Sequence, residues 1–188
     1  MWEYINFIDL RILEIIRTYF SSSFMDSIMV LITKLGDRGL IWIIISVILL
    51  VSKKYKRIGI TMIVALLLTS IIGEGIIKNI IQRPRVFNSI NDIELIIKAP
   101  SSYSFPSGHT ASSFAAATVL GYYIKKYKYV FYFCAFLVAF SRLYLWVHYP
   151  SDIVGGIILG ILGGYIAIII INNSIIKRGC RMNSSIKN

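Results

Sequence analysis

Long apolar runs take up most of this sequence and limit what it can fold into. Hydrophobic residues make up 56% and charged residues 15% of the 188 residues, and the mean hydropathy is +0.71. This is more apolar side chain than a soluble domain of this length can bury in its core. A membrane-spanning helix needs about 20 apolar residues, so roughly 120 residues would form about six spans joined by short loops. The sequence therefore predicts one all-α, polytopic membrane domain.

Six candidate transmembrane spans follow an amphipathic segment at the amino terminus. Residues 1–23 place isoleucines at three- and four-residue steps, as in a helix that lies in the membrane interface. Charged residues such as Asp9 interrupt this segment, so it does not read as a signal peptide. We expect a six-helix membrane domain over 24–175 and a basic cytoplasmic tail over 176–188. The spans are expected at about 24–35, 38–52, 58–77, 109–124, 129–147 and 151–172.

The distribution of Lys and Arg predicts how the chain is oriented. Short cytoplasmic loops carry an excess of these residues. With six spans, eleven of them fall on one side together with the amino terminus, so both termini are expected in the cytoplasm. They are Lys53, Lys54, Lys56, Arg57, Lys125, Lys126, Lys128, Lys177, Arg178, Arg181 and Lys187. A net charge of +11 would suggest nucleic acid in a soluble chain, but here it sets orientation and no nucleic-acid partner is expected.

A smaller group of basic residues falls on the opposite, outer face together with both histidines. It consists of Lys34, Arg38, Lys78, Arg83, Arg85, Lys98 and Arg142. This placement goes against the usual charge bias and therefore indicates a function. Lys78, Arg83 and Arg85 lie within eight residues at the end of the third span, where they could also be snorkelling anchors. Pro84 predicts that the helix stops near Gln82 and that a turn places Arg85.

Two more segments on this face carry the histidines. Ser107, Gly108 and His109 precede an apolar span, where the free backbone N–H groups of a helix start bind anions. A simple helix cap with an interfacial histidine is the alternative. His148 is followed four residues later by Asp152, whose carboxylate can accept from the imidazole and make the other ring nitrogen a nucleophile. A His–Asp pair that only caps the helix is the alternative here.

Together these segments hold the groups needed for phosphoryl transfer without a metal ion. Cations, including the planar guanidinium of Arg142, hold the non-bridging oxygens. One histidine attacks phosphorus and the other protonates the leaving oxygen. No metal or other cofactor is expected, because Glu74, Asp92 and Glu94 lack the paired spacing of magnesium ligands. The two cysteines, Cys134 and Cys180, also lack metal-ligand spacing.

The sequence resembles the type 2 phosphatidic acid phosphatase superfamily of membrane lipid phosphatases. The signature of that family reads K-x6-R-P, then P-S-G-H, then S-R-x5-H-x3-D. Its second and third parts match fully at Pro106–His109 and Ser141–Asp152. The first part matches at Lys78 and Arg85, with Val86 in place of the final proline. The resemblance also implies a six-helix bundle with the site on the outer face.

Carried over by position, the resemblance implies His148 as the nucleophile that forms a phosphohistidine, Asp152 as its orienting partner and His109 as the general acid. It implies a phosphate-binding cradle made of Lys78, Arg85, Ser107, Gly108 and Arg142. We expect an enzyme of the cell membrane that removes a terminal phosphate from a lipid phosphate or diphosphate. Undecaprenyl diphosphate is favoured, because the composition rich in isoleucine, lysine and asparagine fits a bacterium of low genomic G+C.

Several alternatives stay open at this point. The substrate is otherwise phosphatidylglycerophosphate or phosphatidic acid, or the chain is a non-enzymatic phospholipid-binding protein. Glu74 is expected to pair with Lys78, although a substrate or proton role is possible. Arg83 is a fourth phosphate contact or a headgroup anchor. The segment from Val86 to Phe105 is expected to act as a lid or a re-entrant piece. Glycines at 156, 160 and 164 would let a helix approach closely, within one chain or between chains.

Overall fold

The computed structural model describes residues 2–89 and 95–185, and of residues 2, 3, 38 and 175–185 it describes the backbone only. This described part is helical and contains no β-strand, which confirms the all-α class. The helices are α1 (Trp2–Phe20), α2 (Ser23–Gly36), η1 (Asp37–Gly39), α3 (Leu40–Val51), α4 (Lys56–Ser70), η2 (Ile71–Ile77), α5 (Lys78–Ile81), α6 (Val86–Ser89), α7 (Gly108–Tyr123), η3 (Lys125–Tyr127), α8 (Lys128–Tyr144) and α9 (Pro150–Ser185).

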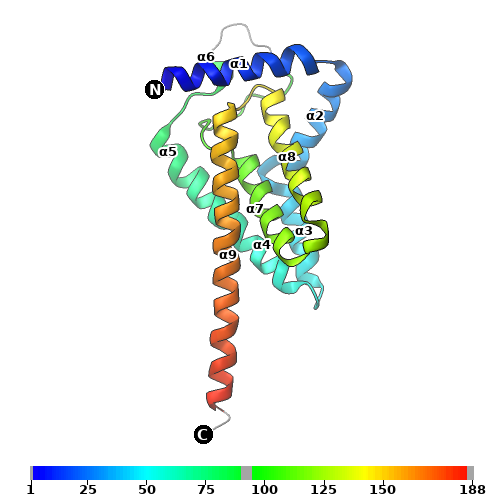
Figure 1. Ribbon diagram of the computed structural model, residues 1–188, viewed down its shortest axis with the longest axis vertical. Helices are drawn as coiled ribbons and strands as arrows, with labels where there is room; N and C mark the ends of the chain where they lie inside the picture. The colour runs from blue at the N-terminus through cyan, green and yellow to red at the C-terminus, as the bar shows by residue number, and fades with distance from the viewer. Residues whose placement is uncertain (1, 90–94, 186–188) are drawn as a thin grey trace.

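Helix α7 forms the centre of the bundle. Its small side chains, such as Ala115 and Ala116, are fully buried, and the neighbouring helices α4, α8 and α9 pack around it (Figure 1). Trp42 of α3 and Met62 of α4 belong to the same core cluster. A helix that is buried on all sides needs no polar face, which explains why α7 shows little separation of apolar and polar residues.

Helices α2 and α3 differ from the expected pair of antiparallel spans. Gly36 lies beside His109 at the start of α7, and further along the chain Trp42 Nε1 donates to Ser113 Oγ at 2.9 Å. Helix α2 therefore runs beside α8 to the start of α7, and α3 continues in the same direction past α7 (Figure 1). The prediction of six antiparallel spans is wrong at this point. The reason is that only the short η1, which ends at Gly39 with φ of 70°, separates them and bends the chain without reversing it.

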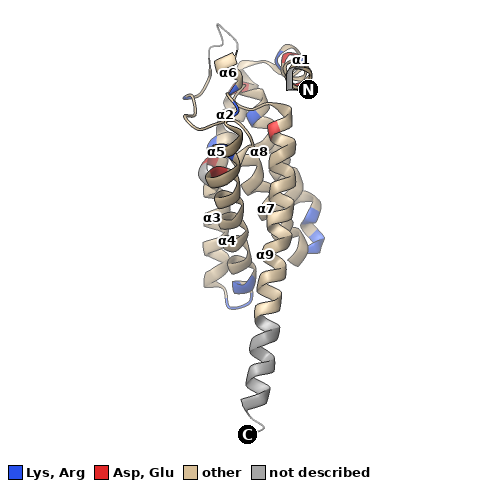
Figure 2. Ribbon diagram, turned by 90° about the vertical axis from the view of Figure 1, so that its left-hand side faces the viewer, with Lys and Arg blue, Asp and Glu red and all other residues tan. Residues whose placement is uncertain are grey.

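Helix α1 lies across one end of the bundle, and α9 ends at the other (Figure 1). Leu13 and Ile16 face the protein, whereas Tyr4, Phe7 and Ile15 are exposed, as in an amphipathic helix at an interface. The basic α3–α4 and α7–α8 loops lie toward the end away from α1 (Figure 2). Helix α1 and the end of α9 thus lie at opposite ends of the bundle, an arrangement that differs from the expectation of both termini on one side of the membrane.

The described helices carry the apolar surface that a membrane protein needs. The segments Lys56–Ser89 and Pro150–Ser174 each contain an 18-residue stretch apolar enough to cross a membrane, with mean hydropathies of 2.2 and 2.6. Leu40–Val51 is a shorter apolar helix. Large apolar side chains, including Ile48 and Ile158, are exposed on the outside of the bundle. Apolar surface of this extent fits a protein that lies in a membrane.

Glycines allow α9 to lie directly against α7. A Cβ atom at Gly160 would lie 2.5 Å from the carbonyl oxygen of Ala111 and 2.8 Å from Cβ of Phe114. At Gly164 it would lie 2.8 Å from Cβ of Thr118. Since these contacts involve backbone and Cβ atoms, the helices would have to move apart to admit a side chain. The expected close approach is therefore confirmed within one chain.

We expect Gly160→Ala to destabilise the protein, because the added methyl group overlaps the backbone of α7. Overpacking of this kind costs roughly 1–3 kcal/mol. Thermal unfolding in detergent should show a lower Tm for this variant. The matched control is Gly75→Ala, because a Cβ atom at Gly75 meets no atom of the described residues within 4 Å. A Tm that is unchanged in Gly160→Ala would contradict the packing described for α7 and α9.

Candidate active site

The chain turns sharply after α5, and this turn separates the two cations of the first motif. Gln82 adopts a left-handed conformation with φ of 48°, and its N–H donates to the carbonyl oxygen of Lys78. The helix thus stops where Pro84 predicts. Lys78 is buried, and its Nζ lies 2.7 and 2.9 Å from the two carboxylate oxygens of Glu74. The expected Glu74–Lys78 ion pair is present.

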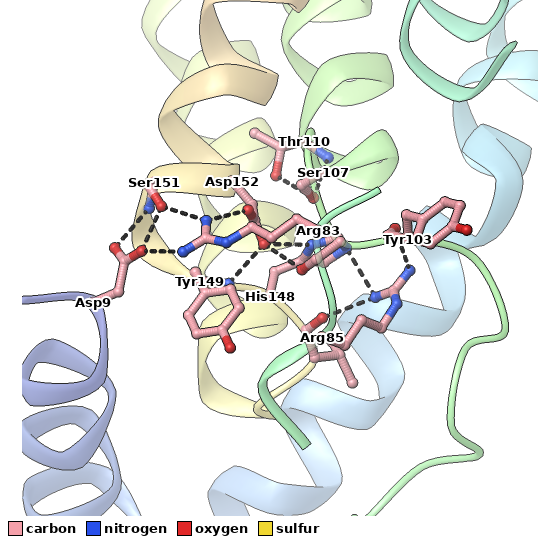
Figure 3. A network of polar contacts seen from close by, with 12 residues as sticks. Asp9, Arg83, Arg85, Tyr103, Ser107, Thr110, His148, Tyr149, Ser151 and Asp152 are labelled. Carbon is pink, nitrogen blue, oxygen red and sulfur yellow. Dashed lines mark hydrogen bonds and ion pairs between the residues drawn. The ribbon is translucent and has the colours of Figure 1, made fainter. Parts of the chain in front are cut away.

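Arg85 is held by backbone carbonyl groups and points toward the third motif. Its Nε donates to the carbonyl oxygen of Ser102 at 2.7 Å, and Nη1 donates to that of Val147 at 2.8 Å. Nη1 also lies 3.2 Å from His148 Nε2 (Figure 3). Ser102 Oγ accepts from both Arg85 and Lys78 at 3.1 Å. One serine therefore brings the two cations of the first motif together.

The start of α7 forms a wall of the site. Ser107 caps the helix, because its Oγ accepts from the N–H of Thr110 at 3.4 Å and from the Thr110 hydroxyl at 3.0 Å. A Cβ atom at Gly108 would lie 2.3 Å from a carboxylate oxygen of Glu74. The Glu74 carboxylate thus lies against the N-terminus of α7 beside Lys78. A position that accommodates one anion between a helix start and a lysine also suits a phosphate group.

His148 and Asp152 form the expected pair on the first turn of α9 and the loop before it. His148 Nδ1 lies 3.3 Å from Asp152 Oδ2 (Figure 3). Since a carboxylate can only accept, Nδ1 carries the proton. His148 Nε2 faces the N–H of Arg85, so this nitrogen has a lone pair. The contacts therefore select the tautomer in which Nδ1 carries the proton and Nε2 keeps its lone pair.

The His148 imidazole is neutral in the folded protein. Burial lowers the pKa of His148 to about 3, because the charged form loses its hydration. The hydrogen bond to Asp152 opposes this effect, while the positive charges of Arg85 and Arg142 add to it. A neutral imidazole keeps its lone pair, which is the protonation state that nucleophilic attack requires.

The remaining two predicted site residues have partners that the sequence analysis missed. His109 Nε2 lies 2.9 Å from Asp37 Oδ1 at η1. Arg142 is buried and donates through Nη1 to Thr33 Oγ1 of α2, while its Nε has no hydrogen-bond partner among the described residues. Both partners come from the α2–η1 segment. Their residue types carry no motif, so the sequence offered no signal for them.

The structure thus brings the three motifs to one end of the bundle, around His148. Among the residues whose side chains are described, no group of three or more His, Cys, Asp or Glu lies close enough to hold a metal ion. Asp92 and Glu94 lie outside the described residues, as do Ile90 and Ile93 of the segment expected to form a lid.

The buried, neutral His148 should make stability depend on pH. In the unfolded chain a histidine titrates at about pH 6.5, so between pH 6.5 and about 3 the unfolded state binds up to one more proton than the folded state. Stability is therefore lost as the pH falls below about 6.5, by up to about 1.4 kcal/mol per pH unit. We expect Tm to fall more steeply in the wild type than in His148→Asn, measured from about pH 7 to about pH 4.5. Equal slopes would contradict a neutral, buried His148.

Comparison with known proteins identifies the family. The sequence matches the family model of the PAP2 superfamily over residues 58–176. A protein of Sulfolobus acidocaldarius named undecaprenyl-diphosphatase is 31% identical over 155 residues, which cover 82% of this chain and 74% of that protein.

Two solved structures share the fold. Aquifex aeolicus LpxE aligns with a TM-score of 0.76 and 28% identity, over 86% of this chain and 94% of that one. A transmembrane PAP2 type phosphatidylglycerolphosphate phosphatase from Bacillus subtilis aligns with a TM-score of 0.71 and 25% identity, over 90% of this chain and 87% of that one. These matches confirm the resemblance that the three motifs carry. The chain therefore belongs to the PAP2 superfamily and is a lipid phosphatase of that superfamily.

Proposed function

We propose that this lipid phosphatase hydrolyses undecaprenyl diphosphate at the outer face of the cell membrane, through a phosphohistidine on His148 and without a metal ion. The observation that carries this proposal is the arrangement around His148. Its Nδ1 faces the Asp152 carboxylate at 3.3 Å and its Nε2 faces the guanidinium of Arg85 at 3.2 Å. The nucleophilic atom is therefore adjacent to a cation that would hold the phosphate group.

The proposed reaction has two steps. Lys78, Arg85 and Arg142, with the backbone of Ser107 and Gly108, bind the non-bridging oxygens of the terminal phosphate. His148 Nε2 attacks phosphorus, the bond from phosphorus to the leaving lipid oxygen breaks, and His109 gives that oxygen a proton. A water molecule then attacks the phosphohistidine, His109 takes its proton, and inorganic phosphate leaves while His148 is restored. The Glu74 carboxylate has to move from Gly108 when phosphate binds.

The orientation in the membrane follows from the charges of the two bundle ends. Lys53, Lys54, Lys56 and Arg57 of one loop, and Lys125, Lys126 and Lys128 of another, lie toward the end away from α1 (Figure 2). Loops rich in Lys and Arg stay in the cytoplasm. We place the active site and α1 at the outer face, and the carboxyl-terminal end of α9 in the cytoplasm. Because α2 and α3 run in the same direction, together they make one crossing of the membrane. The chain then crosses the membrane five times, and both basic loops lie on the same side.

The choice of lipid rests on sequence similarity and composition. The Sulfolobus relative is named for undecaprenyl diphosphate, whereas the Bacillus subtilis structure is named for phosphatidylglycerolphosphate. The first match is more similar in sequence, and the amino-acid composition also favours the first substrate. Phosphatidylglycerophosphate and phosphatidic acid are the second candidates, because the proposed cradle contacts only the phosphate group that all three lipids share.

His148→Ala should abolish phosphate release by the purified protein in detergent, by about 10⁴-fold or more, since no other group forms the covalent intermediate. Binding of the lipid should stay measurable, because the cradle cations are unchanged. Activity of the wild type should survive EDTA. Phosphate release by His148→Ala at the rate of the wild type would exclude His148 as the nucleophile, and loss of activity in EDTA would exclude the metal-independent reaction.

The lipid is tested by measuring phosphate release from undecaprenyl diphosphate, phosphatidylglycerophosphate and phosphatidic acid under the same conditions. We expect the highest kcat/KM with undecaprenyl diphosphate. A higher value with either phospholipid would reassign the substrate without changing the mechanism. If the wild type binds these lipids but releases phosphate from none, the protein does not perform the proposed reaction.

A further inference from the structure

We infer that Asp9 and Arg83 are positioning residues that connect the amphipathic helix α1 to the nucleophile through Asp152. The inference rests on the proposed roles of His148 and Asp152. Sequence analysis left Arg83 as either a phosphate contact or a headgroup anchor. The contacts of Arg83 point to neither role, because they run between two buried carboxylates (Figure 3).

Both terminal nitrogens of Arg83 pair with carboxylates, whereas those of Arg85 have neutral partners. Its Nη1 donates to Asp152 Oδ1 at 2.7 Å and to Ser151 Oγ at 2.6 Å. Its Nη2 donates to Asp9 Oδ2 at 2.8 Å and to Asn6 Oδ1 at 2.6 Å. Each of these nitrogens carries two hydrogens, so both are fully used. The ring of Tyr149 also covers the guanidinium, 3.9 Å from its Cζ.

Asp9 explains why α1 lies where it does. The side chain of Asp9 is 5% exposed, although it belongs to a helix with an apolar outer face. A buried carboxylate has to be paired and hydrogen-bonded to be tolerated. Besides Arg83, Asp9 accepts from the backbone N–H of Ser151 at 3.0 Å and from the Ser151 hydroxyl. These bonds fix α1 to the first turn of α9, next to Asp152.

The other end of this network sets the orientation of Asp152. Arg83 holds Oδ1, so Oδ2 is left to face His148, the backbone N–H of Tyr149 and the hydroxyl of Ser104. Asp9 balances the charge of Arg83, which leaves the negative charge of Asp152 to stabilise the positive charge that develops on His148 during attack. Without Asp9, the positive charge of Arg83 would be balanced by Asp152 alone. Without Arg83, the two carboxylates of Asp9 and Asp152 would face each other with no cation between them.

Because neither side chain contacts the proposed phosphate cradle, changing them should affect kcat and not KM. We propose to measure phosphate release by the full-length Asp9→Asn and Arg83→Lys variants, together with inhibition by orthovanadate as a phosphate-site probe. Removing charged hydrogen bonds of this kind should lower kcat roughly tenfold or more. The KM and the inhibition constant should stay within about twofold of the wild type.

The matched control is Glu14→Gln on the same helix. Glu14 is exposed and pairs with the exposed Arg11 at 3.3 Å, so its loss should leave kcat unchanged. A wild-type kcat in Asp9→Asn would overturn the inference. So would a rise in KM and in the orthovanadate inhibition constant at unchanged kcat, because that result would make Arg83 a phosphate contact.

Asn6→Ala provides a second variant if Asp9→Asn fails to fold in detergent. It keeps every charge and removes one acceptor from Arg83 Nη2, so we expect kcat to fall about threefold at unchanged KM. A wild-type kcat in this variant would also contradict the inference. The wild type serves as the reference for the proposed function itself: if it releases no phosphate, that function fails, whereas an active wild type with unaffected variants contradicts only the positioning role.

Discussion

Asp152 is fully buried, and its carboxylate accepts hydrogen bonds from four groups in different parts of the chain. Two of these donors, the Ser104 hydroxyl and the Arg83 guanidinium, come from the segments before α7 and after α5. The other two, His148 and the Tyr149 N–H, precede α9. A buried charge is tolerated only when its partners are all in place, so one carboxylate fixes the relative positions of these segments and of the neutral His148 between them.

The motifs predicted which residues meet at the site, because residue type and spacing identify candidate phosphate-binding groups wherever the chain folds them together. Lys78, Arg85, His148 and Asp152 were all predicted in this way. The partners of these groups were not predictable, since they are ordinary residues far away in the sequence. Asp9 lies 74 positions from Arg83. A pattern of neighbouring residues in the sequence cannot predict a contact between residues so far apart.

Hydropathy likewise located the helices but not their directions. The polar break at Gly36 to Gly39 ends an apolar run, and a break of this kind is compatible with a reversal or with a bend. The hydrogen bond between Trp42 and Ser113 shows that the chain bends here and does not reverse. As a result, α1 lies at the end of the bundle that holds the site. The glycines of α9 are the opposite case. Their four-residue spacing predicts close packing, and backbone contacts with α7 confirm it.

The proposed mechanism requires that His148 Nε2 receives the phosphoryl group. Trapping the phosphohistidine tests this step most directly. The protein would be mixed with substrate labelled in the terminal phosphate, quenched in alkali within milliseconds, and digested for mass spectrometry. We expect an acid-labile phosphate on the peptide that contains His148, and none in Asp152→Ala at the same time point. A label on His109, or phosphate release without any labelled peptide, would contradict the mechanism.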